Sequence, residues 1–492
     1  MSVRSAMPGL VTLMGCAQLF GIDNTSGPAA QPDAPGPSSS LTVDRYSVGA
    51  TIVQAPQDLS QLTAAQFFAS DEAIPGTVTA ANAWSVPADS TSVQFELPDF
   101  PTPIQRTLAL PDETMSTLFG VLEHPNPTPA PAPSSIAISV TLPTPIAAGE
   151  SYQVHTLGSW TQFVMAGPDI VVGGTALSET YDFATSTSIT GRPLEAITPD
   201  DAVLLLRFAG DQLTGALVAP PYDQVANPSG TITGTLAAVQ LDQTLSAAID
   251  PATALARMGS AQPAPTATST NWSLVAAPGY AIASTSGVLL NAAAAAPTDT
   301  SVAATYTSQF MANDWHPVFT WAPTGSHVSN VAFGSGTLPV TTFTQLVDFM
   351  DASTGPLSAN LPAGQPLAIS LAGTPLVTDA LAVPLDVTQR LDVSFTADVA
   401  DNTLYQVDVF LLVPNDPTTP TAYVFQNVMA MTGVTADFTI PANTLQVGSS
   451  YVIRAVCLSG GFPAVATGDL TQRALPLAEG LLDSGAFTVT AP

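Results

Sequence analysis

The stretch IPANTLQVGSSYVI, residues 440–453, has a counterpart in LPTPIAAGESYQV, residues 142–154. Both contain an apolar residue, a glycine, a tyrosine and a second apolar residue at identical spacing: Leu445, Gly448, Tyr451 and Ile453 in one, and Ile146, Gly149, Tyr152 and Val154 in the other. The pattern predicts a tyrosine corner. There the chain turns at the glycine between two sheets, and the buried tyrosine hydroxyl bonds the upstream backbone.

Short runs rich in Thr, Val, Leu and Ile surround both stretches and are separated by 45 Pro and 34 Gly. β-Branched runs of this length between turn residues favour strands in all-β sandwiches. The clearest runs are 92–97, 136–142, 203–208, 231–236, 391–395, 405–412 and 451–458. Helix signals are few. The strongest is Asp250-Pro251 before 252–258 and Gly259, and weaker ones cover 63–68 and 344–350.

The two corner stretches resemble those of fibronectin type III and related immunoglobulin-like domains. The resemblance implies tandem β-sandwich domains, with Gly149, Tyr152, Gly448 and Tyr451 as structural residues of two corners. We therefore expect one sandwich in 41–185, a middle sandwich with a short helix in 190–360, and a fibronectin type III-like domain in 365–492.

The first residues address a different question, that of location. Arg4 and the apolar run after it have the form of a secretory signal that is too short to span a bilayer, and Leu13-Met14-Gly15-Cys16 follows. This segment resembles a bacterial lipoprotein signal. The resemblance implies a signal peptide in 1–15, lipid attachment at Cys16 (palmitate among the acyl chains) and, because Ala17 follows, an outer-membrane or cell-surface address. Residues 16–40 would then be the anchor and a flexible tether.

Charge excludes several functions. The chain of 492 residues has a net charge of −29, and all nine of its basic residues are arginine. Without lysine there can be no Walker A loop, Schiff-base enzyme or S-x-x-K hydrolase. Nine scattered arginines cannot build a nucleic-acid surface. No G-x-S-x-G or H-E-x-x-H motif occurs, and we assign no catalytic residue.

Site-prone residues are densest in one segment, which holds Asp314, Trp315, His316, Trp321 and His327. On one extended strand Trp315 and Trp321 would share a face, as in a sugar-stacking platform, and the histidines suggest a weak metal site. Pro317 is expected to interrupt that strand, and tryptophan in β-sandwiches is usually core. The core interpretation is favoured, and the ligand-binding one is kept as a candidate.

Calcium is the second ligand considered. Asp398, Asp401 and Asp416 flank the run at 405–412, and Asp-rich β-loops can bind Ca²⁺ through their oxygens. No Asp-x-Asp-x-Asp-Gly loop is present, so solvated turns are favoured and no metal or cofactor is assigned. Cys457 alternates with inward-facing residues and is expected to be an inert core thiol.

These observations predict a lipid-anchored envelope protein that acts as a structural, adhesion or binding module rather than as an enzyme. Its expected partners are the membrane, through the anchor, and an envelope or extracellular protein or glycan; nucleic acid is excluded. Two alternatives stay open. One is a secreted hydrolase, with glycan as a candidate substrate and the middle domain catalytic. The other is a carbohydrate-binding module, which requires Trp315 and Trp321 to be exposed and coplanar.

Overall fold

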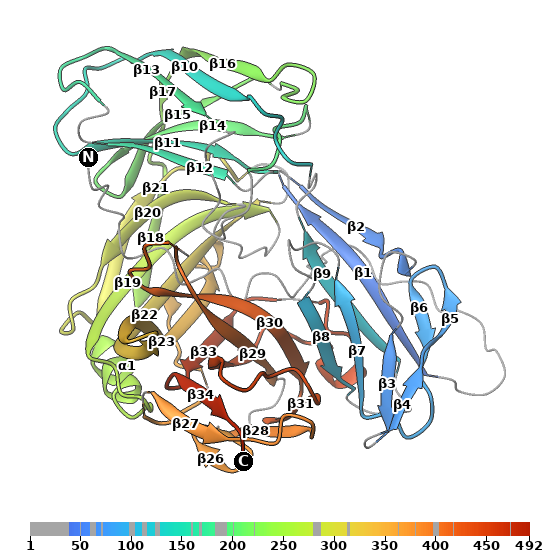
Figure 1. The fold of residues 1–492 in the computed structure, drawn as a ribbon. Helices are drawn as coiled ribbons and strands as arrows, with labels where there is room; N and C mark the ends of the chain where they lie inside the picture. Colours follow the sequence, from blue (N-terminus) through green and yellow to red (C-terminus); the bar gives the residue numbers. More distant parts are fainter. Residues whose placement is uncertain are drawn as a thin grey trace.

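The structure is a computed structural model. It describes residues 39–49, 51–59, 65–69, 72–97, 104–110, 116–123, 128–158, 161–166, 170–182, 194–199, 201–220, 222–278, 287–311, 315–362, 364–378, 380–396, 403–416, 418–472 and 474–492. Across these ranges the chain is almost entirely strand, in several packed sheets (Figure 1). The all-β, multidomain sandwich fold predicted from the sequence is confirmed. The predicted signal (1–15), Cys16 and residues 17–38 of the tether lie outside the described residues.

The N-terminal module (39–123) lies on the right in Figure 1. Its strands are β1 (Ser40–Val48), β2 (Ile52–Pro56), β3 (Gln66–Ala69), β4 (Glu72–Pro75), β5 (Thr77–Ala80), β6 (Ala83–Ser85), β7 (Ser92–Leu97), β8 (Ile104–Ala109) and β9 (Thr117–Glu123). One sheet has the order β2-β1-β6-β5, with β9 beside β1, and the other joins β4, β3, β7 and β8.

The second module (128–238) stands at the top of Figure 1 and contains the first predicted corner. Its strands are β10 (Ser135–Thr141), β11 (Glu150–Thr156), β12 (Thr161–Ala166), β13 (Ala176–Asp182), β14 (Val203–Ala209), β15 (Gln212–Val218), β16 (Ser229–Thr235) and β17 (Ala237–Ala238). Sheet β13-β10-β16 packs over β12-β11-β14-β15 around a core that runs from Ile136 to Leu236. This sandwich therefore extends on both sides of the expected division at 185–190.

The third module (243–362) repeats that arrangement with longer strands. Its elements are β18 (Gln243–Ala248), α1 (Pro251–Met258), β19 (Ala267–Pro278), β20 (Val288–Ala294), β21 (Ser301–Tyr306), β22 (Trp315–Phe333), β23 (Gly336–Asp351), the 3₁₀ turn η4 (Ala352–Thr354) and β24 (Leu357–Ser358). Sheet β21-β18-β24 faces β20-β19-β22-β23, which is the strand order of the second module.

The C-terminal module (364–492) contains the second corner. Its elements are β25 (Ile369–Leu371), β26 (Thr374–Pro375), β27 (Leu381–Pro384), β28 (Leu391–Phe395), β29 (Thr403–Pro414), β30 (Tyr423–Gly433), β31 (Asp437–Ile440), β32 (Ser450–Gly460), the turn η5 (Val465–Thr467), β33 (Leu477–Asp483) and β34 (Phe487–Thr490). Sheet β26-β25-β28-β31 packs on β30-β29-β32, to which β33 and β34 add.

All four modules share one feature: a strand near the start of the module pairs in parallel with a strand at or near its end. The pairs are β1 with β9, β10 with β16, β18 with β24, and β27 with β34. A parallel pair cannot be made by a hairpin, so each closure joins segments far apart in the sequence. The chain thus contains four sandwich-like modules within its described ranges.

The modules share sheets and cores instead of being joined only by linkers. β8 pairs with β30, β23 pairs with β33, and Gln212 of β15 pairs with Asn291 of β20, so a single ladder of strands passes through all four. Cores are shared as well. One core combines the N-terminal module with β23, β29, β32 and β33, and another combines β14 and β15 with the third module.

The α-helix α1 occurs where the sequence predicts it. The Asp250 carboxylate caps its first turn by accepting from Thr253 N at 3.0 Å, Pro251 occupies the first helical position, and Gly259 follows its end. Arg257 lies in the last turn, where a cation interacts favourably with the helix dipole. No helix among the described residues is long and apolar enough to cross a membrane.

The two weaker helix predictions are wrong. Of 63–68, the residues from Gln66 onward form β3, and 344–350 belong to β23. Residues 344–350 are all buried because Val347 and Phe349 face one core while Leu346 and Met350 face another. A strand covered on both faces reads as a continuous apolar run, which periodicity alone does not distinguish from a helix.

Pro317 does not interrupt its strand, contrary to expectation. β22 runs from Trp315 through Pro317, which pairs with Ala276 of β19. Pairing of β22 with β23 starts only at Val318, so Pro317 lies where the strand has one neighbour. Proline is tolerated at such edge positions because no ladder bond needs its missing N–H.

Candidate functional site

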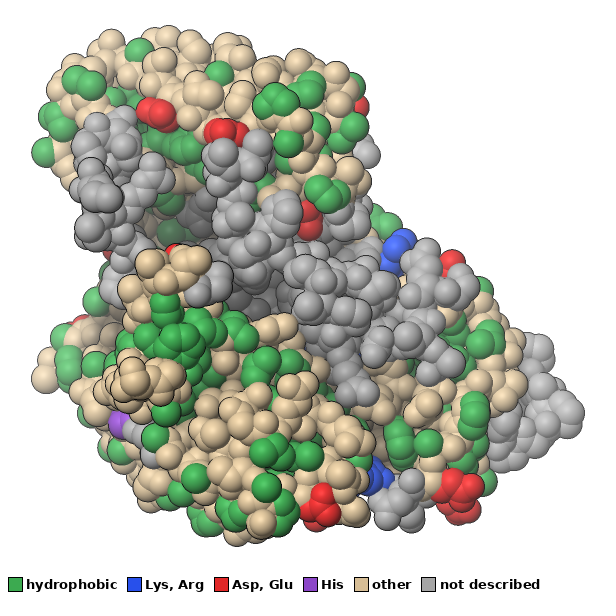
Figure 2. Space-filling view, in the orientation of Figure 1, with side chains coloured by type: hydrophobic (Ala, Val, Ile, Leu, Met, Phe, Trp, Pro, Cys, Tyr) green, Lys and Arg blue, Asp and Glu red, His purple; other side chains and the backbone are tan. Residues whose placement is uncertain are grey.

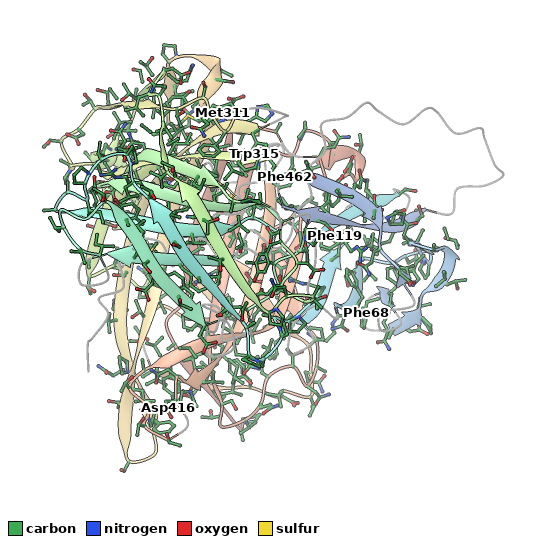
Figure 3. All side chains as sticks on the ribbon, turned by 90° about the horizontal axis from the view of Figure 1, so that it is seen from above. Phe68, Phe119, Met311, Trp315, Asp416 and Phe462 are labelled. Carbon is green, nitrogen blue, oxygen red and sulfur yellow. The ribbon has the colours of Figure 1, made fainter. Side chains whose placement is uncertain are left out.

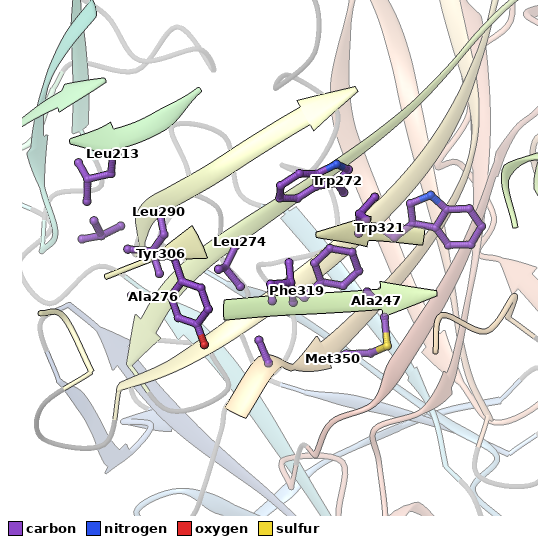
Figure 4. Packing of buried hydrophobic residues seen from close by; sticks show 14 of the residues in the cluster. Leu213, Ala247, Trp272, Leu274, Ala276, Leu290, Tyr306, Phe319, Trp321 and Met350 are labelled. Atoms are coloured by element: carbon purple, nitrogen blue, oxygen red, sulfur yellow. The ribbon is translucent and has the colours of Figure 1, made fainter. Parts of the chain in front are cut away.

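Trp321, a member of the predicted ligand-binding segment, lies in the core of the third module. It is 1% exposed and packs in the same cluster as Trp272 and Phe319, whose rings are 6.0 Å apart (Figure 4). Trp315 is half-buried and packs against that core. Trp321 therefore has no open ring face, and the exposed coplanar pair that a sugar platform requires is not formed.

The histidines of the segment do not converge. His316 and His327 lie eleven positions apart on β22, which at about 3.3 Å per residue separates them by roughly 36 Å. Both are half-buried, and His327 Nδ1 lies 3.1 Å from the carbonyl oxygen of Ala264. Asp314 lies outside the described residues.

At the second corner, Tyr451 is buried and its hydroxyl accepts a hydrogen bond from Gln446 N at 3.0 Å. Gly448, between these two residues, has a φ of +87°, a left-handed value that favours glycine. Burial raises the pKa of Tyr451, so the hydroxyl stays neutral and able to bond the backbone. The corner ties the start of β32 to the preceding loop.

The first corner has the same backbone turn but a charged connection. Gly149 has a φ of +83°. The Tyr152 hydroxyl donates to Glu150 Oε2 at 3.1 Å, and Ala147 N donates to the same oxygen at 3.0 Å, so the carboxylate relays the bond to the backbone. Arg207 of β14 binds Glu150 Oε1 at 2.8 Å. The carboxylate thus joins β11, its preceding loop and β14.

Electrostatics at this corner follow from the contacts. Burial works against ionisation of Glu150, but hydrogen bonds from Arg207, Ala147 and Tyr152 hold its pKa below the ordinary value. Burial raises the pKa of Tyr152 to about 12. The same position of the second corner is Ser449, which carries no charge, so the two corners share a turn but not their chemistry.

Replacing Gly149 or Gly448 by alanine is expected to lower the free energy of unfolding by about 1–2 kcal/mol, the cost of a side chain in left-handed backbone. No atom lies within 4 Å of a Cβ added at either position, so the loss is conformational. Urea unfolding would measure it. Gly336→Ala is the control, since a Cβ there meets only Phe333 O at 3.9 Å, an ordinary van der Waals contact, and its φ is not left-handed; equal losses in all three variants would contradict the prediction.

The most concentrated chemistry in the described chain is a buried line of alternating charges, which we call the charge row. Its members are Arg106 on β8, Asp408 on β29, Arg454 on β32 and Asp483 on β33, which are 4%, 1%, 6% and 1% exposed. Arg454 Nε lies 2.7 Å from Asp483 Oδ1, and its Nη2 lies 3.1 Å from Oδ2. The Arg454 guanidinium also lies over the Phe410 ring, 5.1 Å from its centroid.

Asp408, at the centre of the charge row, has an arginine on each side, Arg106 and Arg454. Burial raises its pKa, against the opposing charges of Arg106 and Arg454 and hydrogen bonds from Gln406 and Asn427. Burial also lowers the pKa of Arg106, which Asp408 partly offsets. Arg106 Nε and Gln406 Oε1 are buried without a hydrogen-bond partner. The row is thus costly to bury and only partly satisfied.

A further buried carboxylate, outside the charge row, belongs to Asp348 of β23. It is 2% exposed and accepts a hydrogen bond from Asn360 N at 2.6 Å. Its neighbours across the sheet are Trp321 on β22 and Ala478 on β33. Burial raises the pKa of Asp348 to about 7, so its charge changes near neutral pH.

Of the three aspartates considered as calcium ligands, the structure describes only Asp416. Asp398 and Asp401 lie outside the described residues. Asp416 sits in the loop between β29 and β30, far from Trp315 in the view from above (Figure 3). Its carboxylate accepts from Thr418 N at 2.7 Å and Thr419 N at 3.1 Å, and bonds from Thr418 lead the groups that hold its pKa well below the usual range. Among the described residues no three His, Cys, Asp or Glu side chains are placed to hold a metal ion.

Cys457 is fully buried in the C-terminal core, and burial raises the pKa of its thiol to about 12. The predicted lipid-bearing residue, Cys16, lies outside the described residues. The described arginines are likewise buried or half-buried, which leaves little basic surface on the face in Figure 2. They are Arg45, Arg106, Arg207, Arg257, Arg390 and Arg454.

The sequence did not predict the charge row or the buried carboxylate of Asp348. Each had a local signal, a lone charge inside an apolar strand-like run, as Asp408 has in QVDVF and Arg454 in VIRAV. What the sequence does not contain is the register that aligns four such residues from different strands. The row is therefore a product of tertiary structure.

No protein-family model matches this chain, and no curated protein matches it either. Among solved structures, trypsin-activated alpha-2-macroglobulin from Escherichia coli aligns with 89% of this chain at 11% identity and a TM-score of 0.12. The chain covers 28% of that protein's length. A likeness of this size carries no argument about fold or function.

Proposed function

We propose that this chain is a lipid-anchored protein of the bacterial cell envelope, with a structural, adhesive or binding role. The observation that supports the proposal is the order of segments at the N-terminus. A secretory-type run leads to Leu13-Met14-Gly15-Cys16, a Pro-, Gly- and Ser-rich tether follows, and the all-β body starts at β1. Ala17 after the cysteine favours the outer membrane.

The tether sets how far the body can stand from the membrane. Twenty-four peptide steps separate Cys16 from Ser40, so at 3.3–3.6 Å per residue the fully extended reach is about 80 Å. An acyl chain contributes about 0.8 kcal/mol per buried methylene, and several chains anchor a protein stably. An attached body of this kind can contact partners some distance from the bilayer.

The fused modules support a binding or structural role because their surfaces move together. Shared cores and continuous ladders hold the four modules as one body. A partner that contacts two modules therefore meets surfaces already in place, which lowers the entropy lost on binding. Sandwich faces and loops of this body are the proposed contact surfaces.

The anchor is tested by Cys16→Ser in the full chain, produced in a bacterial host with radiolabelled palmitate. The parent is expected to incorporate label and to fractionate with the outer membrane. The variant is expected to lose both properties, because the thioether cannot form. Cys457→Ser is the matched control and should keep the label, since Cys457 is buried. A parent without label, or a variant that stays with the membrane, would refute the proposed anchor.

The binding role is tested with the unlipidated variant and purified cell envelopes. Saturable co-sedimentation that unlabelled protein competes away would support a partner in the envelope. Sedimentation that rises linearly with concentration would show that only the lipid connects the protein to the envelope.

A further inference from the structure

The charge row is aligned across three modules with strict register. Arg106 of β8 pairs with Ala430 of β30, Ala430 pairs with Asp408 of β29, and Asp408 pairs with Arg454 of β32. Arg454 pairs with Asp483 of β33, whose Oδ2 accepts from Phe343 N of β23 at 2.9 Å. The line therefore starts in the N-terminal module, crosses the C-terminal module and ends on the third.

Stability is a poor explanation for such a line. Buried ion pairs lose hydration that their attraction barely recovers, and apolar replacements of similar size are often neutral or stabilising. Here the unpartnered Arg106 Nε adds to that cost. The shared apolar core, which includes Phe95, Phe119, Leu404 and Val456, already holds the two modules together. The presence of the charge row therefore needs an explanation other than stability.

The pairing of β8 with β30, which we call the seam, is a place where register is otherwise weakly specified. It has only four residue pairs and is parallel. A shift of β8 by two residues would return every side chain to its original face, so the alternation of apolar residues accepts it. A shift toward the end of β30 would move Arg106 from Ala430 to Thr432 and away from Asp408; in the other direction a bulge leaves Val428 without a partner.

Ala430 increases the difference in energy between the observed and the shifted register of β8. Adjacent strands are about 4.8 Å apart, so the Arg106 side chain must cross β30 to approach Asp408 on the next strand. Ala430 has no atoms beyond Cβ and leaves that path open. In the shifted register the longer side chain of Thr432 would occupy it, and both charges would be buried without each other, which costs several kcal/mol as a rule.

We propose that the charge row is the register key of the seam. It selects the observed pairing of β8 with β30 from the pairings that apolar packing accepts, and it thereby keeps the β30 edge closed to β8 of a second copy of this chain. The row gives conformational specificity and no net stability.

The test removes both charges at the seam with Arg106→Met and Asp408→Asn in the full chain, because the amide oxygen at 408 can still accept from the buried Gln406 Nε2. Hydrogen–deuterium exchange would follow β8 and β30 peptides, light scattering the oligomeric state, and thermal unfolding the global stability. The double variant is expected to unfold near the parent's temperature. Its β8 and β30 amides should exchange at least about tenfold faster, and a dimer should appear as concentration rises.

Arg390→Met is the matched control. Arg390 belongs to the C-terminal module and lies 5.4 Å from the centroid of Phe68 in the N-terminal module, so it crosses the same interface outside the row. Its β8 and β30 exchange should match the parent's. A double variant with parent-like exchange and oligomeric state would overturn the proposal. A double variant that unfolds much earlier or fails to fold would overturn it too, because the row would then be a source of stability.

Discussion

Replacing Arg454 by methionine is expected to lower the free energy of unfolding by about 3–5 kcal/mol, the largest single-residue loss we expect in this chain. The substitution keeps an apolar stem of similar length but removes both bonds to Asp483 and the guanidinium that lies over Phe410. Asp483 is 1% exposed, so its carboxylate would stay buried and lose its principal counter-charge. Urea unfolding at neutral pH would measure the loss.

Two further variants separate the cost of an uncompensated charge from the worth of the pair. Arg454→Met with Asp483→Asn removes both charges and keeps an oxygen to accept from Phe343 N, so most of the loss should be recovered. Arg257→Met, at a half-buried arginine outside the charge row, should stay within about 1 kcal/mol of the parent. If the double variant were no more stable than the single one, the desolvation account would be wrong.

Local chemistry made much of the fold predictable. The run 391–395 is β28 and the run 92–97 is β7, because β-branched residues between turn residues have few other options. Asp250, Pro251 and Gly259 delimit α1 for equally local reasons. The repeated corner pattern coincides with two turns of the same left-handed glycine conformation.

Burial on two faces limited the prediction elsewhere. β14 reads VLLLRF because Leu205 faces the core of the second module while Leu204 and Leu206 face the core shared with the third. No alternation marks such a strand, and no local signal tells which module it joins. The same ambiguity made 344–350 look helical. Module boundaries drawn from composition therefore have little support where modules share cores.

The candidate site shows the same division between local and non-local information. Aromatic density around Trp315 and Trp321 was visible in the sequence, and its burial against Phe319 was not. Conversely, the charge row depends on pairings between positions as distant as Arg106 and Ala430. Such pairings cannot be recognised in a single sequence. The N-terminal signal is local in character and stays a prediction for Cys16→Ser to test.

Asp348 carries the second large prediction, which concerns pH. Its carboxyl has a pKa of about 7 in the folded protein, against 3.8 as the ordinary value, because burial disfavours the charge. Below pH 3.8 both the folded and the unfolded chain hold the proton, so this group adds no pH dependence. Between pH 3.8 and 7 only the folded chain holds it, and stability falls as pH rises. Above pH 7 neither holds it and the loss is complete.

The expected loss follows from the shift of about 3 units, at about 1.36 kcal/mol per unit, and totals about 4 kcal/mol. Asp348→Asn cannot ionise and should lack it, so the unfolding free energy of the parent minus that of the variant should fall by about this amount between pH 4 and 7 and level off above. Urea unfolding across that range would measure the difference, in which the other carboxylates cancel. Asn360→Ala is the control: the bond to Asp348 comes from the Asn360 backbone N, so this variant should keep the parent's profile. A constant difference between parent and Asp348→Asn would mean that the buried carboxyl ionises as readily as it does in water, and that water or a cation reaches it between β22 and β33.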